Sequence, residues 1–339
     1  MKTESPHRHR TVALSVAVGL GAVLTSCGGN LEGAGGGEAG AADFPTGPVT
    51  MLIGGNPGGS ADLILRAIAD PGADELGEPM LVENVPGANG ALAAGQLASA
   101  DPDGQEVMIF NGTLAYITPL AVSADEAVDI EDYEVITGVS LDDYVLLASP
   151  DSGFQDLEGL RAAGRPLSYA TTGVGTGSQL SQAYLLEEAG LEGTAVPFDG
   201  GAPTLAAVLG SQVDMGVVQI SESINQIEAG QVTPLAVFAD ERNSALPDVP
   251  TATESGLDVV VQQTRAMVAP KGTPPETVDR LRDVFRAAFA DPEYQAFNEA
   301  NQLVPYEVSG EQVVEDWTAL REEYATFVEE SGVDFGEQG

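Results

Sequence analysis

The sequence predicts an α/β protein with largely parallel sheets, and three observations lead to this fold class. The chain has 339 residues, a length typical of about two domains, and its 43% hydrophobic and 19% charged residues are a globular composition. From Asp43 on, short apolar runs alternate with amphipathic segments, as strands alternate with helices. Two of the runs lead through a glycine-rich loop into a helical segment.

The first half of the body begins with a strand, a loop and a helix, at Val49–Ile53, Gly54–Ser60 and Ala61–Ala69. Apolar residues four positions apart predict the helix, and Pro71-Gly72 is expected to end it. The next segments continue the alternation: strand Met80–Glu83, helix Asn89–Ala98, turn Asp101–Gly104, and strands Val107–Phe110, Tyr133–Val139 and Tyr144–Ala148.

The second half repeats the alternation and then becomes mainly helical. The expected strands are Leu167–Ala170, Gly193–Pro197, Met215–Gln219, Thr233–Phe238 and Thr264–Ala269, and the expected helices are Ser178–Glu188, Pro203–Leu209, Pro274–Ala290, Asp291–Asn301 and Glu311–Ser331. Trp317 is spaced helically from Val313 and Leu320 and is predicted to lie in the core.

The N-terminal 26 residues have the pattern of an export signal. Basic residues within Met1–Arg10 precede an uncharged stretch, Thr11–Leu24, and small residues lead up to Cys27. The stretch is shorter than the roughly 20 apolar residues of a membrane span. The position of Cys27 after these small residues resembles a bacterial lipobox. This resemblance implies cleavage before Cys27 and lipidation of its sulfur. The alternative is an ordinary secretory signal. Residues 27–43 are glycine-rich and are expected to form a flexible tether.

Composition excludes several kinds of chemistry. Neither His nor Cys occurs after Cys27, which removes Ser-His-Asp and Cys-His catalysis, His-ligated zinc and disulfides. The formal net charge of −39 argues against nucleic-acid binding, which needs a basic footprint. We therefore expect no metal, no cofactor and no nucleic-acid partner.

The two glycine-rich loops are the strongest candidates for a binding site. They are Gly54–Ser60 and Thr171–Ser178, and neither contains an acidic residue. In open α/β sheets ligands bind beyond the carboxyl ends of the strands, where glycines expose main-chain N–H groups and the next helix begins with partial positive charge. The loops therefore predict anion sites, although such loops also serve as plain connections. Neither matches a dinucleotide or Walker fingerprint.

Six motifs in one order resemble the substrate-binding receptors of tripartite tricarboxylate transporters, the Bug family. The resemblance runs from Phe44 to Gly332, and its motifs are Pro57-Gly58-Gly59-Ser60-Ala61-Asp62, Val82-Glu83-Asn84-Val85-Pro86-Gly87-Ala88-Asn89-Gly90, Asp101-Pro102-Asp103-Gly104, Val196-Pro197-Phe198-Asp199-Gly200, Gly210-Ser211-Gln212-Val213-Asp214, and Leu246-Pro247-Asp248-Val249-Pro250-Thr251 with Ala269-Pro270-Lys271-Gly272-Thr273-Pro274.

The resemblance implies a two-lobed type II periplasmic-binding-protein fold with the ligand cleft between the lobes. One lobe would take residues 44–146 plus 263–339 and the other 147–262. The protein would be a non-enzymatic, monomeric receptor, held by its lipid on the extracytoplasmic face of the cell membrane. It would deliver a small organic carboxylate to the membrane permease subunits of the transporter.

Carried over position by position, the resemblance implies a set of ligand-binding residues in four loops. They are Asn56, Pro57, Gly58, Gly59, Ser60 and Asp62; Asn111 and Thr113; Thr172, Gly173, Gly175, Thr176, Gly177, Ser178 and Gln179; and Phe198, Asp199 and Gly200. Asp199 replaces a lysine that is frequent in the family. This loss of a cation argues against a second ligand carboxylate near position 199, or favours a ligand amine or hydroxyl there.

Several of these residues also have a plain structural interpretation. One interpretation of Asp62 is that it complements the N-terminus of its helix. Arg66 and Arg265 are expected in solvated surface pairs, with a ligand clamp as the alternative, and Asp142-Asp143 on a solvated acidic face. Phe198, Tyr116 and Tyr169 fit ordinary packing.

Two other functions stay open at this point. A ligand-sensing lipoprotein that signals to a membrane sensor kinase would have the same features. A secreted hydrolase would need Ser60 or Ser178 as its nucleophile, with Lys271 or a carboxylate as the base.

Overall fold

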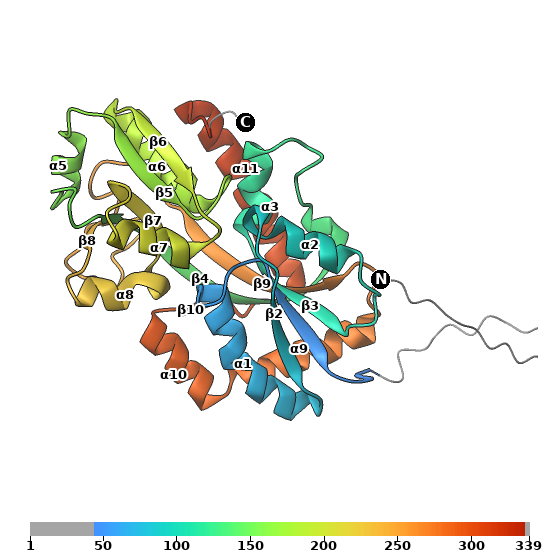
Figure 1. Ribbon diagram of the computed structural model, residues 1–339. Coiled ribbons are helices and arrows are strands. Elements are labelled where there is room, and N and C mark those ends of the chain that lie inside the picture. Colours follow the sequence, from blue (N-terminus) through green and yellow to red (C-terminus); the bar gives the residue numbers. More distant parts are fainter. Residues whose placement is uncertain (1–43, 336–339) are drawn as a thin grey trace, which may run out of the picture. The chain divides into compact units, whose positions relative to one another are not determined.

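The computed structural model describes residues 44–335, so the predicted signal, Cys27 and the tether up to residue 43 lie outside the described residues (Figure 1). The sheet has the strand order β2-β1-β3-β9-β4-β7-β5-β6, and β8 and β10 both pair with β4. The strands are β1 (Val49–Ile53), β2 (Met80–Asn84), β3 (Glu106–Asn111), β4 (Tyr133–Ala148), β5 (Leu167–Thr171), β6 (Gly193–Pro197), β7 (Met215–Gln219), β8 (Thr233–Val237), β9 (Gln262–Pro270) and β10 (Val304–Pro305).

Two parallel groups of strands are joined by antiparallel ones. Strand β1 pairs in parallel with β2 and β3, and β5 pairs in parallel with β6 and β7. Strand β4 runs antiparallel to β9 from Tyr133 to Asp143, and antiparallel to β7 from Tyr144 to Ala148. One strand therefore passes from one half of the molecule into the other, which the alternation of strands and helices did not indicate.

Helices cover both faces of this sheet. They are α1 (Ser60–Leu76), α2 (Ala91–Ala98), α3 (Thr113–Tyr116), α4 (Thr118–Ala121), α5 (Leu157–Arg161), α6 (Gly177–Ala189), α7 (Gly201–Leu209), α8 (Ile220–Glu228), α9 (Pro275–Phe289), α10 (Pro292–Asn301) and α11 (Gly310–Ser331), with short 3₁₀ turns at Ala88–Gly90 and Ile130–Asp132. In Figure 1, α1 and α9 lie side by side on one face of the first half, and α2, α3 and α11 lie on the other.

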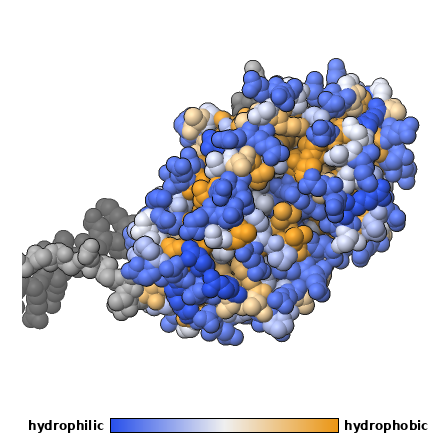
Figure 2. Space-filling model, turned by 180° about the vertical axis from the view of Figure 1, so that it is seen from behind, coloured by the Kyte–Doolittle hydropathy of each residue, from blue (hydrophilic) through white to orange (hydrophobic). Residues whose placement is uncertain are grey.

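Three apolar cores hold these layers together. One packs α1 and α9 against β1 and β3, a second packs α7 and α8 against the second half of the sheet, and the largest reaches through both halves. Trp317 is 1% exposed in the largest core, as predicted. Most of the surface seen in Figure 2 is hydrophilic, and the large hydrophobic side chains exposed among the described residues are Leu81, Leu92 and Val304.

Three predicted elements differ clearly from the structure, and helix α7 also begins at Gly201 rather than at the predicted Pro203. Helix α1 does not end at Pro71-Gly72 but continues to Leu76, where Gly77 adopts the left-handed conformation (φ 86°) and its N–H donates to the Ala73 carbonyl. Proline removes one helical hydrogen bond without forcing an end. A Cβ at Gly72 would lie 2.6 Å from the Met80 sulfur, so this glycine lets α1 pack closely on β2.

The other two differences concern β4 and α2. The two predicted strands Tyr133–Val139 and Tyr144–Ala148 are one strand of 16 residues, because Asp142 is neutralised inside the protein rather than solvated. The predicted helix Asn89–Ala98 begins only at Ala91, since Asn89 has a left-handed φ of 55°. The predicted lobe boundaries, 44–146 plus 263–339 and 147–262, stay a prediction.

Candidate functional site

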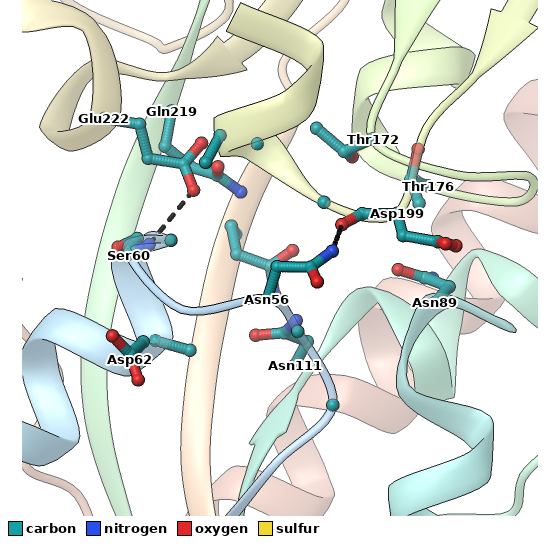
Figure 3. A pocket seen from close by; sticks show the side chains of 18 of the residues that line it. Asn56, Ser60, Asp62, Asn89, Asn111, Thr172, Thr176, Asp199, Gln219 and Glu222 are labelled. Atoms are coloured by element: carbon teal, nitrogen blue, oxygen red, sulfur yellow. Dashed lines mark hydrogen bonds between the residues drawn. The ribbon is translucent and has the colours of Figure 1, made fainter. Parts of the chain in front are cut away.

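A cavity of about 60 Å³ lies where loops from both halves of the sheet meet (Figure 3). It is reached by the start of α1, by the loop after β5, by the loop before α7 and by the start of α8. The lining residues are Ile53, Gly54, Gly55, Asn56, Gly59, Ser60, Ala61, Asp62, Gly87, Asn89, Asn111, Thr113, Tyr144, Thr172, Thr176, Asp199, Gly200, Gly201, Ala202, Pro203, Gln219, Glu222, Gln263 and Arg265.

The N-terminus of α1 faces this cavity and is occupied by a carboxyl group from the other half. No side chain of the N-cap residue Gly59 caps the helix. Instead the Ser60 N–H donates to Oε1 of Glu222 at 3.0 Å. The Ser60 hydroxyl donates to Oδ2 of Asp142 at 2.8 Å. An anion is favourable at this place because the helix N-terminus carries partial positive charge.

Asp62 supports the same loop from within α1. Its Oδ2 accepts from the Gly58 N–H at 2.9 Å, and its Oδ1 lies 2.8 Å from Arg66 and 3.1 Å from the Asn84 amide nitrogen. Burial raises the pKa of Asp62, but the hydrogen bonds from Arg66, the Gly58 N–H and Asn84 outweigh burial and hold that pKa below its ordinary value. The carboxylate thus stabilises the α1 loop.

The loop after β5 forms the opposite wall. Thr176 is the N-cap of α6, and its hydroxyl accepts from the Gln179 N–H at 3.2 Å. The Gln179 side chain accepts from the Gly175 N–H at 2.8 Å and donates to the Phe335 carbonyl at 2.9 Å. The Ser178 hydroxyl donates to the Val217 carbonyl at 2.6 Å. The side chains of Gln179 and Ser178 therefore form hydrogen bonds within the protein, and these bonds stabilise the conformation of the loop.

The start of α7 supplies main-chain donors from a third direction. Gly200 precedes the helix with φ 99°, and no side chain caps it. The N–H groups of Gly201 and Ala202, the first two helical residues, have no partner within the helix, and both residues line the cavity. Across the cavity, the Asn56 amide donates to the Asp199 carbonyl at 2.6 Å, so this bond links the two walls (Figure 3).

The predicted residues fall into three groups. Those that line the cavity are Asn56, Gly59, Ser60, Asp62, Asn111, Thr113, Thr172, Thr176, Asp199 and Gly200. Gly173 and Phe198 line a neighbouring, more apolar cavity of about 720 Å³, which Asn56 and Asp199 also border. Pro57, Gly58, Gly175, Gly177, Ser178 and Gln179 line neither cavity. The two predicted loops do meet around one cavity.

Sequence reasoning placed on the surface two charged residues that are buried, although a ligand clamp was the alternative for Arg265, which lines the cavity. Arg265 and Asp142 form an ion pair of 2.8 Å and are 2% and 1% exposed, so the expectation that they lie on solvated faces is wrong. Burial raises the pKa of Asp142 in spite of the attraction of Arg265 and the hydrogen bonds from two serines. The two residues lie on neighbouring strands, since Asp142 is opposite Gln263 in the β4–β9 register. The sequence signal that could have predicted this pair is one acidic and one basic residue, Asp142 and Arg265, each within a largely apolar strand segment.

Glu222 was missed, because no helix was predicted over 220–228. It lies in the first turn of α8. Burial raises the pKa of its carboxyl group from 4.5 to about 7, although the N–H groups of Ser60 and Gln219 and the charge of Arg265 act in the opposite direction. Within residues 44–335, no hydrogen-bond donor reaches its Oε2.

Lys271 does not fit the base of the serine-based hydrolase, because it is 61% exposed, lies 3.5 Å from Glu134 and lines neither cavity. The Ser60 hydroxyl does donate to the Asp142 carboxylate at 2.8 Å, but this carboxylate is also held in the buried ion pair with Arg265. The part of the chain that the structure describes contains no cluster of His, Cys, Asp and Glu suited to a metal ion. Over the same residues, no helix combines the length and the hydrophobicity that a membrane crossing requires.

Comparison with known sequences gives one family. The sequence model of the tripartite tricarboxylate transporter family receptor matches residues 64–322. A relative from Cupriavidus necator, the UPF0065 protein in the gbd 5' region, is 31% identical over 279 residues, which cover 81% of this chain and 84% of that protein.

Comparison with solved structures gives the same fold. The periplasmic binding protein BugD has a TM-score of 0.80 and 29% identity, and the match covers 86% of this chain and 99% of that one. MatC from Rhodopseudomonas palustris, solved with bound malate, has a TM-score of 0.76 and 26% identity, over 82% of this chain and 99% of that one. The mixed α/β, two-lobed fold that the sequence predicted is confirmed by these neighbours.

Proposed function

This chain belongs to the tripartite tricarboxylate transporter receptor family, and on that premise we propose that it binds a small organic carboxylate in the 60 Å³ cavity and passes it to a membrane permease. Its relatives are solute-binding receptors rather than enzymes. The ligand would contact the predicted residues that line the cavity, and the loop residues behind them would fix the loop conformations.

The observation that carries this proposal is the convergence of two helix N-termini on one cavity. Helices α1 and α7 both begin there; the Ser60 N–H of α1 is bonded to Glu222, whereas the Gly201 and Ala202 N–H groups at the start of α7 have no partner within their helix. Main-chain N–H groups and neutral side chains such as Thr172 and Asn111 complete the lining. Such fixed neutral donors hold a buried carboxylate well, because a bound anion then keeps its hydrogen bonds when water is excluded. The malate bound to MatC is a ligand of this kind.

The bond between Asn56 and Asp199 supports a clamp-like mode of binding. The two residues come from loops 143 positions apart in the chain, on opposite walls of the cavity. A ligand between these walls would be covered when the bond forms and released when it breaks. Hinged closure of two lobes around a ligand is a common motion in binding proteins.

We further propose that Cys27 carries a lipid that anchors the mature receptor to the extracytoplasmic face of the membrane. The proposal rests on the order of basic, apolar and small residues before Cys27. A monomeric receptor on a glycine-rich tether would reach its permease while staying bound to the membrane. Intact-mass measurement of the membrane fraction tests this: the expected mass is that of a chain starting at Cys27 plus acyl groups, and a chain with an unmodified Cys27 would contradict it.

The binding function is tested by calorimetric and thermal-shift titration of the mature chain with mono-, di- and tricarboxylates. We expect at least one carboxylate to bind with micromolar affinity, about −8 kcal/mol. Asn56→Ala should weaken that binding, whereas Asn225→Ala, a change at an exposed position of α8, should not. Stabilisation by a different class of metabolite, with no response to any carboxylate, would overturn the proposal.

A further inference from the structure

The charges around the cavity do not balance, and this limits which carboxylates can enter. Asp62 is paired with Arg66, and Asp142 is paired with Arg265. Glu222 and Asp199 also line the cavity, and neither forms an ion pair within the described residues, although the charge of Arg265 acts on Glu222. A ligand that brings only negative charge therefore meets uncompensated carboxylates, and the formal net charge of −39 repels it from a distance.

Glu222 is the more specific of these two groups, because its carboxyl is fixed. Oε1 accepts the Ser60 N–H at 3.0 Å. A Cβ at Gly201 would overlap Oε2, so the carboxyl lies directly against the start of α7. The Glu222 carboxyl thus occupies part of the space between the N-termini of α1, α7 and its own helix α8.

Three buried polar atoms in the lining lack partners among the described residues. Oδ1 of Asn111 and Oε2 of Glu222 are acceptors, whereas Nε of Arg265 is a donor, so the atoms on Glu222 and Arg265 are opposite in character. A buried polar atom without a partner is unfavourable by about 1–3 kcal/mol. A ligand that satisfies the atoms on both Glu222 and Arg265 must carry an acceptor and a donor.

We propose that the ligand is a carboxylate that also carries a positively charged nitrogen, and that the nitrogen donates to Oε2 of Glu222. This inference rests on the proposed function and narrows its ligand class. The ligand carboxylate would accept from Arg265 and from the neutral donors of the lining, and the ammonium group would compensate Glu222. An ammonium is preferred to a hydroxyl because it neutralises a carboxylate inside a cavity where an uncompensated charge is costly.

Binding of matched ligand pairs to the mature chain at pH 8, where the Glu222 carboxyl group is mainly ionised, tests the inference. The pairs are aspartate and succinate, alanine and propanoate, and 6-aminohexanoate and hexanoate; each pair compares a ligand with and without an ammonium group. For the pair that fits the cavity, we expect the ammonium ligand to bind at least about tenfold more tightly, or about 1.4 kcal/mol. This comparison uses the unaltered protein and needs no variant to fold.

The variant Glu222→Gln then assigns the preference to this residue. Glutamine keeps the shape and can still accept the Ser60 N–H, so the preference for the ammonium ligand should fall to about twofold or less while carboxylate binding persists. Glu228→Gln, an exposed position at the end of the same helix, should leave the tenfold preference unchanged.

The outcomes separate this inference from the proposed function. If succinate, propanoate or hexanoate binds as tightly as its ammonium partner, the inference is wrong and the receptor function stands. If malate binds more tightly than both aspartate and succinate, the donor is a hydroxyl and the inference is likewise wrong. If no carboxylate of either kind binds, the proposed function itself fails.

Discussion

Replacing Glu222 by glutamine should make the protein more stable at neutral and alkaline pH and leave it unchanged in acid. The pKa of Glu222 is raised from 4.5 to about 7 by burial. Because this pKa is higher in the folded state, the folded protein keeps a proton between pH 4.5 and 7 that the unfolded chain loses. The stability that this proton provides is complete below pH 4.5 and is lost as the pH rises to 7.

The size of the effect follows from the two pKa values. Each pH unit between them corresponds to about 1.4 kcal/mol, so the difference between 4.5 and about 7 amounts to about 3 kcal/mol in the free energy of unfolding. Glutamine does not ionise and avoids this loss. The charges that act on the carboxyl are Arg265, which favours ionisation, and Asp142, which opposes it.

Urea unfolding of the wild type and of Glu222→Gln at pH 5 and pH 8 measures this effect. The variant should be nearly as stable as the wild type at pH 5 and more stable by about 3 kcal/mol at pH 8. Glu228→Gln provides the control and should show no pH-dependent difference. Equal free energies of unfolding for wild type and Glu222→Gln at both pH values would refute the burial of an ionisable Glu222.

Three further predictions concern the same site. Asp142→Asn leaves Arg265 buried without its partner and should lower the free energy of unfolding, measured in urea, by about 3–5 kcal/mol. The double variant Asp142→Leu/Arg265→Met should recover most of this loss. A loss below about 1 kcal/mol for Asp142→Asn would contradict the buried pair. Gly201→Ala should lower the melting temperature because its methyl group overlaps the Glu222 carboxyl, and the decrease should disappear in a Glu222→Ser background; an equal decrease in both backgrounds would exclude this contact. Asn56→Ala should weaken ligand binding about five- to tenfold in calorimetry, about 1 kcal/mol, with little change in the melting temperature, and unchanged binding would show that the bond across the cavity does not contribute.

The fold and the position of the cavity could be predicted because local sequence determines them. Consecutive residues predict a strand, a glycine-rich loop and the start of a helix, as in Val49–Ser60. Parallel strands then bring such loops to the same edge of a sheet. This is why Ser60 and Thr172 were expected to share a site, and both line the 60 Å³ cavity.

The charged part of the site could not be predicted because it depends on contacts between distant residues. Glu222 meets the Ser60 N–H from 162 positions away, and Arg265 meets Asp142 from 123 positions away. Read alone, Asp142 in a strand indicates exposure, since a charge is rarely buried without a partner. The partner becomes visible only when the register of β4 and β9 is known.

Pro71 shows a different limit of sequence reasoning. A proline followed by glycine normally predicts the end of a helix, yet α1 continues past both residues to Leu76. A Cβ at Gly72 would lie 2.6 Å from the Met80 sulfur, so a larger residue would require the Met80 side chain to move. The helix ends only where Gly77 adopts the left-handed conformation.

A crystal structure with the carboxylate that stabilises the protein most would test the central claim most directly. The account predicts that the ligand lies between Ser60 and Thr172, with its carboxylate on main-chain N–H groups and neutral side chains of the two walls. A ligand bound only in the neighbouring 720 Å³ cavity, or on the outer surface, would contradict the claim that these loops form the binding site.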